Sequence, residues 1–332
     1  MANPIDRIRI AVIGVGRLGQ AHARVLAEMP DVDLAGLYDT DPQRAREIAN
    51  RHDTAVLPDL EAVCEAAEAV SVVVPTTGHF EVASYMLDRG LHTFIEKPIT
   101  TTIEDADVLI DLARTHGLTL QVGHIERFNG AMRALDGMAL SPGFIESHRL
   151  ASFDPRGTDV SVVHDLMIHD IDLIRHLTHS DIDKVDATGV AVISDQIDIA
   201  NARLQFKNGC VANVTASRIS LKKMRKMRLF QRDAYIALDF LEGKSEIYRL
   251  LDDDEPAQPG HFAIPVNTGD GRSRKILREA PPADHRELLK LELGSFLLAV
   301  RGEKPPAVTG DDGREALRVS LEIVSCIEKA AV

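Results

Sequence analysis

Residues 8–22 read IRIAVIGVGRLGQAH, a stretch in which a strand signal runs into a glycine-rich turn and then into a helix signal. The opening run is apolar and rich in β-branched residues, which predicts a buried strand. Gly14, Gly16 and Gly19 follow in the spacing GxGxxG. The first glycine permits a tight turn, the second lets backbone approach a pyrophosphate, and the third lets the helix pack closely on the strand. The stretch predicts a dinucleotide-binding unit, and the alternative is a doubly wound domain with another nucleotide or none.

The second strand signal ends on a carboxylate. Residues 32–39, VDLAGLYD, close on Asp39, twenty residues after Gly19. A carboxylate at this point can accept hydrogen bonds from both hydroxyls of an adenosine ribose, and it repels a 2′-phosphate. The sequence therefore favours NAD over NADP as the cofactor, while Arg44 and Arg46 lie close enough to weaken that preference.

Strand and helix signals alternate up to residue 123, which indicates a parallel sheet covered on both faces and hence an α/β domain. Apolar strands are expected at 8–16, 32–39, 69–75, 92–98 and 118–124, and helices at 17–30, 41–52, 79–89 and 103–116. Asp41 is expected to cap the second of these helices, with Pro42 at its first position.

After residue 123 the chain shows many strand signals with few helices between them. The expected strands are 143–153, 183–193, 197–207, 210–218, 225–231, 234–240 and 245–250, and the expected helices are 129–138, 166–177, 285–301 and 311–330. Residues 252–283 are expected to form a long loop. This pattern predicts an α+β domain with an open, mostly antiparallel sheet. We therefore expect domains at 1–123 and 124–332, with a terminal helix able to pack back on the first domain.

The composition restricts the class of protein. The 332 residues carry a net charge of −13, which argues against a general nucleic-acid binder and against binding to an anionic membrane surface. Cys64, Cys210 and Cys326 form neither a CxxC pair nor a zinc spacing, so we interpret them as free thiols in a reducing cytoplasm. The N-terminus lacks the apolar core of a signal peptide, and no apolar run approaches the ~20 residues of a membrane span. We expect a cytoplasmic protein with a small-molecule substrate.

The fourth strand signal ends in TFIEKPI, residues 93–99. In an open parallel sheet ligands collect outside the carboxyl ends of the strands, so Lys97 is expected in the crevice where a nicotinamide would lie. Pro98 biases Lys97 toward an extended backbone, and Glu96 can orient the ammonium or bind the cofactor. The alternative is a surface ion pair at a strand end.

A second candidate group lies in HDLMIHDIDLI, residues 164–174. Asp165 and His169 are four positions apart and share a helix face, which Asp172 extends. Asp165 can hold one imidazole nitrogen and leave the other for proton transfer. One alternative is a helix N-cap beside a satisfied histidine. A metal site that includes His164 is another, but no further metal-spaced motif supports it, so no metal is expected.

The stretch SRISLKKMRKMRLF, residues 217–230, is basic in an acidic chain. It is either a solvated strand that balances acidic neighbours or an electropositive lip for phosphate groups, where arginine can bind bidentately. For the second interpretation the candidates in this stretch are Arg225 and Arg228. Arg127 and Arg156 add charge near the expected domain junction.

Together these residues resemble the glucose–fructose oxidoreductase / inositol dehydrogenase (Gfo/Idh/MocA) family. The resemblance covers nearly the whole chain through GVGRLGQAH, VVVPTTGHFEVA, IEKPIT, QVGHIERFN and DLMIHDIDLI. The last two motifs, with the basic stretch, are similar to a narrower group that oxidises C3 of UDP-N-acetylglucosamine. The resemblance implies an N-terminal Rossmann domain and a C-terminal open sheet that carries substrate and oligomer contacts, and we expect a homodimer or homotetramer.

The resemblance also implies roles for single residues. Lys97 and His169, the latter with Asp165, are expected to flank the reacting carbon as catalytic groups. With the motif analysis, the expected cofactor contacts are Gly14, Gly16, Arg17, Leu18, Gly19, Asp39, Thr76, His79, Glu96, Lys97 and His124. The expected substrate contacts are Lys97, Arg127, Arg156, Asp165, His169, Arg225 and Arg228. The family also suggests that a pyridoxal-phosphate aminotransferase receives the keto-sugar product.

The activity expected is therefore NAD-dependent oxidation of the C3 hydroxyl of UDP-N-acetylglucosamine. A dehydrogenase of the same family that acts on inositol or a free sugar would not need the basic stretch. A non-enzymatic NAD-binding regulator would keep Gly14 and Asp39 but would need no lysine–histidine pair. A metal-dependent hydrolase is the remaining alternative.

Overall fold

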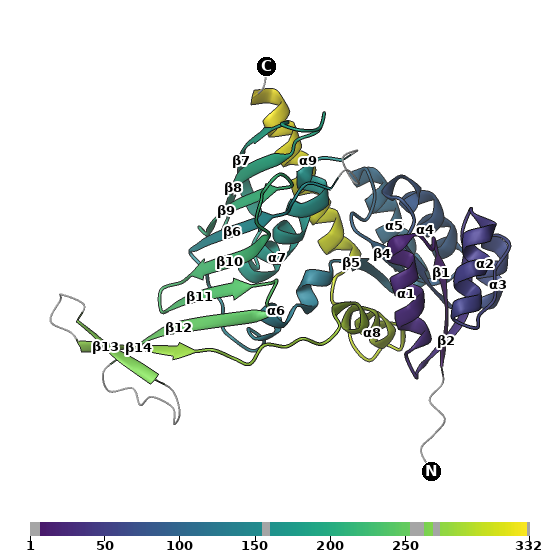
Figure 1. Ribbon diagram of the computed structural model, residues 1–332, viewed down its shortest axis with the longest axis horizontal. Coiled ribbons are helices and arrows are strands. Elements are labelled where there is room, and N and C mark those ends of the chain that lie inside the picture. The colour runs from purple at the N-terminus through teal and green to yellow at the C-terminus, as the bar shows by residue number, and fades with distance from the viewer. Residues whose placement is uncertain (1–6, 155–159, 253–261, 268–272, 331–332) are drawn as a thin grey trace, which may run out of the picture. The chain divides into compact units, whose positions relative to one another are not determined.

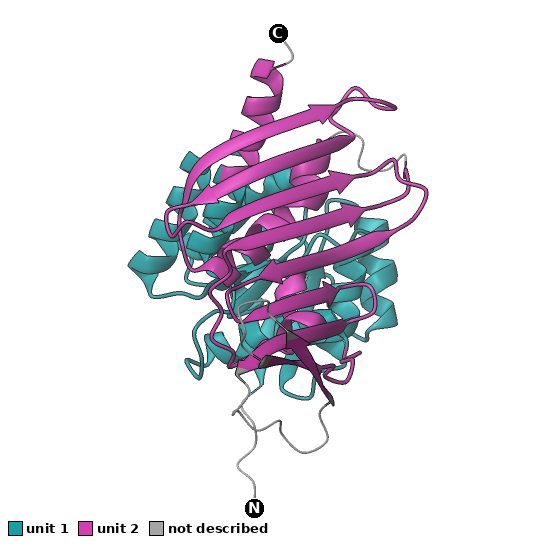
Figure 2. Ribbon diagram, turned by 90° about the vertical axis from the view of Figure 1, so that its left-hand side faces the viewer, with its two compact units in different colours: residues 1–125, 287–318 teal, residues 126–286, 319–332 magenta. Residues whose placement is uncertain are grey.

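Figure 1 shows the computed structural model of the chain, which describes residues 7–154, 160–252, 262–267 and 273–330. The chain forms two compact units, residues 1–125 with 287–318 (unit 1) and residues 126–286 with 319–332 (unit 2), which Figure 2 colours separately. Unit 1 thus includes a segment from near the end of the sequence. We had expected every residue after 123 to belong to the second domain, apart from the terminal helix.

Unit 1 is built on a five-stranded parallel sheet with the order β2-β1-β3-β4-β5. Its strands are β1 (Ile8–Ile13), β2 (Val32–Tyr38), β3 (Ala69–Val72), β4 (His92–Glu96) and β5 (Leu120–Gly123). Val56 adds a parallel bridge to Leu37 beyond β2, where doubly wound dinucleotide-binding sheets carry a sixth strand. The strand order reverses between β1 and β3, so their carboxyl ends border the crevice in which such sheets bind ligands. The expected doubly wound α/β class is confirmed.

Five helices connect these strands: α1 (Arg17–Ala27), α2 (Pro42–Arg51), α3 (Leu60–Ala66), α4 (His79–Asp88) and α5 (Ile103–His116). As predicted, Asp41 caps α2 by accepting the backbone N–H groups of Gln43 and Arg44, and Pro42 occupies the first helical position. α5 ends at Gly117, whose φ of 64° is left-handed. We did not predict α3, because its 7 residues are too few to show a helical period.

A helix from near the end of the chain, α8 (Leu288–Val300), belongs to unit 1 because it completes the core of the parallel sheet. Its Phe296 meets Phe94 of β4 edge-on, with ring centroids 5.8 Å apart. The side-chain amide of Gln121 on β5 donates to the carbonyl oxygen of Glu292 at 3.2 Å. This hydrogen bond joins positions 171 residues apart, a distance over which local sequence patterns carry no signal.

Unit 2 is built on a nine-stranded sheet with the order β13-β14-β12-β11-β10-β6-β9-β8-β7. Its strands are β6 (Phe144–Leu150), β7 (Ile182–Val190), β8 (Ile199–Phe206), β9 (Val211–Ser217), β10 (Met224–Phe230), β11 (Ala234–Asp239), β12 (Lys244–Asp252), β13 (Phe262–Asn267) and β14 (Ser273–Glu279). β6 and β9 pair in parallel, and the other neighbouring strands pair antiparallel. The expected mostly antiparallel sheet is confirmed.

The helical elements of unit 2 are few. They are α6 (Gly130–Arg133), a π-helical turn η3 (Val163–Met167) and α7 (Ile168–Thr178), while η2 (Ile125–Phe128) and α9 (Gly310–Ala330) each contribute to both units. The expected helix 129–138 is reduced to the 4 residues of α6. Asn129 caps it through the N–H of Ala131, and the chain soon reaches the left-handed Gly137, with a φ of 81°.

The expected loop 252–283 was wrong for residues 262–267 and 273–279, while residues 280–283 lie in no helix or strand, as expected. It contains β13 and β14, which pair antiparallel and extend the sheet at one edge, while residues 253–261 and 268–272 lie outside the described residues. The sequence did not predict this hairpin, because its strands contain Pro265 and several charged residues, which weaken a strand signal. Edge strands tolerate both, because one row of their backbone groups needs no partner strand.

Alternation along the strands gives the nine-stranded sheet two different faces. On β6, Ile145 and Arg149 are buried on the face that carries α7, where Arg149 bonds to Asp170. A row of aromatic rings crosses the opposite face on β6, β10, β11 and β12. The row consists of Phe144, Phe230, Tyr235 and Tyr248, with successive ring centroids 5.7, 5.0 and 5.5 Å apart. Figure 2 looks onto this face, and no helix of the described part of unit 2 covers it.

Candidate active site

The glycine-rich turn after β1 has the geometry that its sequence predicted. Gly14 has a φ of 87°, and a Cβ atom there would lie 2.7 Å from the carbonyl oxygen of Val73. A Cβ atom on Gly19 would lie 1.9 Å from the carbonyl oxygen of Gly14, so α1 approaches the turn this closely only without a side chain. A Cβ atom on Gly16 would meet nothing within 4 Å, which leaves open space beside the N-terminus of α1. A pyrophosphate fits that space and the backbone N–H groups around it.

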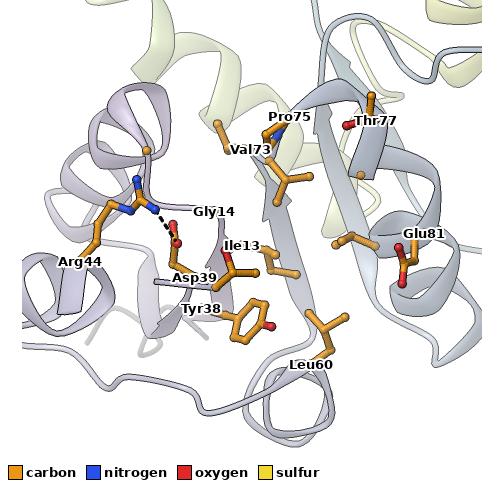
Figure 3. A pocket seen from close by; sticks show the side chains of 15 residues that line it. Ile13, Gly14, Tyr38, Asp39, Arg44, Leu60, Val73, Pro75, Thr77 and Glu81 are labelled. Carbon is orange, nitrogen blue, oxygen red and sulfur yellow. Dashed lines mark hydrogen bonds and ion pairs between the residues drawn. The ribbon is translucent and has the colours of Figure 1, made fainter. Parts of the chain in front are cut away.

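A cavity of about 480 Å³ lies at the carboxyl ends of β1, β2 and β3 (Figure 3). The lining residues labelled in the figure are Ile13, Gly14, Tyr38, Asp39, Arg44, Leu60, Val73, Pro75, Thr77 and Glu81. The cavity borders the point where the strand order reverses, and its volume is typical of a small-molecule site.

Asp39 directly follows β2 and is already engaged by the chain. Its Oδ2 accepts the N–H of Val15 at 2.8 Å, while Oδ1 accepts the N–H of Asp41 at 2.8 Å and Nη2 of Arg44 at 3.1 Å. A carboxylate offers about four acceptor positions, so one remains on Oδ2 for a ribose hydroxyl. Displacement of Arg44 would open a second position, on Oδ1. The dashed line in Figure 3 marks this Arg44–Asp39 ion pair.

These observations fit the adenosine ribose and pyrophosphate of NAD. The turn from Gly14 to Gly19 would hold the pyrophosphate, and Asp39 would hold the ribose, with the cavity beside them. When bound, NAD supplies a nicotinamide ring that accepts a hydride.

Lys97 directly follows β4, at the edge of the sheet where we expected it. Its backbone N–H donates to Oε2 of Glu96 at 3.2 Å, and the Lys97–Pro98 peptide bond is cis. The carboxylate of Glu96 lies over Gly123 at the end of β5, where a Cβ atom would come within 2.9 Å of its atoms. Glu96 therefore orients the backbone at Lys97, and its contact with the cofactor stays a prediction.

His79, which we expected to touch the cofactor, is engaged by the protein backbone. Its Nδ1 lies 2.8 Å from the carbonyl oxygen of Pro98, and its Nε2 lies 3.0 Å from that of Val74. Burial lowers the pKa of His79 below its ordinary value. The ring thus faces two backbone carbonyls, one of them in the residue that follows Lys97.

The other expected cofactor contacts differ in exposure. Arg17 and Leu18 are exposed on the first turn of α1. Thr76 opens a short 3₁₀ turn, and its neighbour Thr77 lines the cavity. His124 is buried directly after β5. Their contacts with a cofactor stay predictions.

Asp165 and His169 lie where the π-helical turn η3 passes into α7, about one helical turn apart. We had predicted a regular helix here; π-helical turns are rare and are frequent at functional sites. Asp172, which we expected beside this pair, accepts hydrogen bonds from Arg127 instead. Nε of Arg127 lies 2.8 Å from Oδ2 and its Nη2 lies 2.6 Å from Oδ1. Arg127 thus forms a bidentate ion pair within unit 2.

Arg225 and Arg228 do not point in the same direction. They are three positions apart on β10, and side chains alternate along a strand, so they lie on opposite faces of the sheet. Arg225 donates to Glu126 at 3.1 Å, whereas Arg228 donates to Glu146 at 3.0 Å on the face of the aromatic row. One diphosphate on one chain can therefore contact one of the two arginines, which corrects our expectation that both bind substrate. Arg156 lies outside the described residues.

Sequence reasoning missed several residues around the site. Tyr38 and Thr77 line the cavity, and His22 of α1 is fully buried and contacts Glu96. The available signal for His22 was its position three residues after Gly19, on the face of α1 that meets the sheet.

Two kinds of feature are absent from the described ranges. No group of three or more His, Cys, Asp or Glu side chains in them could hold a metal ion. None of their helices combines the length and the apolar character that a membrane crossing requires.

The glycine-rich turn, the acid after β2 and the cavity at the strand-order reversal define a dinucleotide-binding protein with a second, large-sheet unit. Residues 8–124 match the family model described as "Oxidoreductase family, NAD-binding Rossmann fold", and residues 132–236 match that of the GFO/IDH/MocA C-terminal domain. The chain belongs to the Gfo/Idh/MocA family of NAD-binding oxidoreductases.

Similar proteins include sugar-nucleotide and inositol dehydrogenases. The chain is 37% identical over 322 residues to UDP-N-acetylglucosamine 3-dehydrogenase from Acidithiobacillus ferrooxidans, with 97% of each chain covered. A solved structure of that enzyme matches with a TM-score of 0.87 at 35% identity, over 97% of this chain and 98% of that chain. Myo-inositol 2-dehydrogenase from Thermotoga maritima is 25% identical, with 97% of each chain covered. Scyllo-inositol dehydrogenase from Lactobacillus casei, solved with NAD(H) and scyllo-inositol, shares the fold with a TM-score of 0.76 at 20% identity, over 98% of each chain.

Replacement of Asp39 by asparagine should reduce the preference for NAD over NADP. We expect the Kd for NAD to rise about 10–100-fold, which corresponds to the loss of one hydrogen bond to a charged group. The Kd for NADP should fall, because Arg44 is then released toward a 2′-phosphate. Titration calorimetry with each cofactor measures both constants. Glu47→Gln, an acid-to-amide change on the exposed side of α2, is the matched control, and an unchanged NAD/NADP ratio in Asp39→Asn would contradict the assignment.

Proposed function

We propose that the chain oxidises the C3 hydroxyl of UDP-N-acetylglucosamine to the 3-keto sugar nucleotide, with NAD as the hydride acceptor. The observation that carries this proposal is the 37% identity over 97% of the chain to a UDP-N-acetylglucosamine 3-dehydrogenase, which extends through both units. Inositol dehydrogenases are 25% identical over a similar length, so inositol oxidation is the second candidate.

Oxidation of a secondary alcohol removes a proton from the hydroxyl oxygen and a hydride from the carbon that bears this oxygen. We assign His169 to removal of the proton, with Asp165 holding one nitrogen of its ring. Lys97 hydrogen-bonds the sugar oxygen and stabilises the alkoxide as its charge develops. Either Lys97 or His169 can serve as the formal base. Lys97 belongs to unit 1, and Asp165 and His169 belong to unit 2.

A panel of substrates tests the proposal directly. Purified protein with NAD is offered UDP-N-acetylglucosamine, myo-inositol, scyllo-inositol and free hexoses, and NADH formation is followed by absorbance. We expect turnover with the sugar nucleotide and none with the others. Turnover of an inositol in place of the sugar nucleotide would move the chain to the second candidate function. Tight NAD binding without turnover of any sugar would favour a regulator.

Mutation of Arg225 is a second test of whether the substrate is a sugar nucleotide or a free polyol. On the proposed function, Arg225→Met weakens the hold on the substrate diphosphate and raises KM for the sugar nucleotide about tenfold, the value of one charge-assisted hydrogen bond. KM for NAD should stay close to wild-type. Lys207→Met, which removes an exposed cation at the other end of the sheet, is the control.

We also propose that the aromatic row on the uncovered face of unit 2 joins two copies of the chain. Phe144, Phe230, Tyr235 and Tyr248 present stacked rings there, and aromatic residues are enriched in such interfaces. Light scattering should report a homodimer or homotetramer for the wild-type chain. Tyr235→Lys should dissociate it, while Val108→Lys on α5 of unit 1 should not. A monomeric wild-type chain would exclude this interface.

The keto product is an electrophile ready for amination, so we propose that a pyridoxal-phosphate aminotransferase consumes it. We place this reaction in the cytoplasm, in keeping with three cysteines that form no disulfide in the described residues.

A further inference from the structure

A buried chain of polar contacts leads from the middle of the parallel sheet to the residue beside Lys97. Nδ1 of His22 on α1 lies 2.9 Å from Oγ of Ser71 on β3. Its Nε2 lies 3.2 Å from Oε1 of Glu96 at the end of β4. His22 and Ser71 are both fully buried, and the side chain of Glu96 is 12% exposed.

One arrangement of protons suits the contacts of this chain while Glu96 is ionised. An ionised carboxylate can only accept, so a proton on Nε2 of His22 favours its 3.2 Å contact with Oε1 of Glu96, although the geometry is not that of a hydrogen bond. If the ring is neutral, Nδ1 then has a lone pair and accepts the hydroxyl proton of Ser71. The carboxylate of Glu96 therefore favours this tautomer, and the hydroxyl of Ser71, which can donate or accept, holds the other nitrogen of the ring.

Glu96 transmits this constraint to the backbone of Lys97. Its Oε1 faces His22, and its Oε2 accepts the backbone N–H of Lys97 at 3.2 Å. Gly123 has no side chain and so leaves room for the carboxylate between β4 and β5. On the other side of Lys97, the ring of His79 lies 2.8 Å from the carbonyl oxygen of Pro98. Two buried imidazoles thus hold the segment that carries the ammonium.

A role limited to core packing does not explain this arrangement. The ring of His22 does contact Phe94, with ring centroids 5.6 Å apart. An apolar side chain would make that contact without the cost of burying a polar ring and an adjacent carboxylate. The polar groups of His22 are all directed toward Ser71 and Glu96, and Glu96 stands next to Lys97.

We propose that His22 is a positioning residue for Lys97 and acts through Glu96, with Ser71 holding the other nitrogen of its ring. The kinetic part of this inference rests on the proposed function, because it assigns Lys97 to the sugar oxygen. The structural part concerns the chain's own polar contacts and is independent of any substrate.

The first experiment uses the protein without substrate. Amide hydrogen exchange, followed by NMR, reports on the N–H of Lys97. We expect His22→Phe to accelerate exchange at Lys97 about tenfold, because Glu96 loses the partner that holds it against this N–H. Nitrogen-15 spectra of the histidine rings should show His22 with its proton on Nε2, and Glu96→Gln, whose side chain can also donate, should shift the ring toward a mixture of tautomers.

The second experiment measures kinetics with UDP-N-acetylglucosamine. His22→Phe should lower kcat about 10–100-fold, the scale of a small misplacement of a catalytic group, while Kd for NAD stays close to wild-type. In a Glu96→Gln background the same substitution should have little further effect, since His22 acts through that carboxylate. The matched control is His92→Phe at the amino end of β4, whose Nδ1 accepts only the N–H of Thr119 among the contacts the structure describes.

The two experiments separate the possible failures. Unchanged exchange at Lys97 in His22→Phe, or a wild-type ring with its proton on Nδ1, would overturn the positioning role. So would independent, additive effects of His22→Phe and Glu96→Gln on kcat. Accelerated exchange at Lys97 together with no turnover of any sugar nucleotide would uphold the positioning role and reject the proposed function. If His22→Phe does not fold, Ser71→Ala supplies both readouts with a smaller expected change.

Discussion

Lys97→Met is expected to lower kcat by about 10²–10⁴-fold, the usual contribution of general acid–base and alkoxide-stabilising groups. Methionine keeps the length of the side chain and removes the charge. Kd for NAD should stay close to wild-type, because we assign the pyrophosphate and ribose contacts to the turn after β1 and to Asp39. Steady-state kinetics with UDP-N-acetylglucosamine and calorimetry with NAD measure the two quantities.

Two further variants make this prediction specific. His169→Ala should lower kcat to a similar extent, since the proposed mechanism needs both groups. Lys290→Met on α8 and His116→Ala on α5 remove the same side-chain types from exposed positions and should leave kcat near wild-type. Near-wild-type kcat in both Lys97→Met and His169→Ala would remove the assigned roles.

Arg149→Met is expected to reduce the free energy of unfolding by about 3–5 kcal/mol, because it removes the buried cation that two buried carboxylates share and leaves Asp170 without this bidentate partner. Nε of Arg149 donates to Asp170 at 2.8 Å and its Nη1 donates to Glu126 at 2.8 Å. Burial of the guanidinium disfavours its charge, but the carboxylates of Asp170 and Glu126 outweigh that effect and raise the pKa of Arg149. Urea unfolding followed by circular dichroism measures the loss.

The exposed ion pair of Lys207 with Asp181 is the comparison for Arg149. Its side chains are 63% and 69% exposed, so Lys207→Met should cost no more than about 1 kcal/mol. Adding Asp170→Leu to Arg149→Met should restore part of the lost stability, since it removes the buried charge that has lost Arg149 as its partner. Equal losses in Arg149→Met and Lys207→Met would contradict the account of a buried charge network.

Some features of the fold and site could be predicted from short stretches of sequence because their causes are local. A positive φ at Gly14 and the cap at Asp41 depend on a few neighbouring residues. Lys97 is a related case: once 92–96 is recognised as a parallel strand, the next residue must lie at the ligand-binding edge of the sheet. The charged β13–β14 hairpin and the short α3 escaped prediction because their local patterns are weak.

The partners of charged side chains could not be predicted in this way. Arg127 and Arg228 looked alike in the sequence, but one pairs with Asp172 and the other with Glu146, and each partner lies many residues away. The opposite directions of Arg225 and Arg228 follow from the two-residue period of a strand. We overlooked that period when we treated the basic stretch as a single patch.

From the order of its residues alone, this chain specifies a doubly wound unit, its NAD-binding turn and the edge where Lys97 stands. These features follow from backbone preferences and from the alternation of strands and helices. Tertiary structure alone assigns α8 to unit 1, pairs Arg149 with Asp170 and connects His22 to Glu96. Contacts of this kind depend on which distant segments the fold brings together, and no short stretch of sequence contains that information.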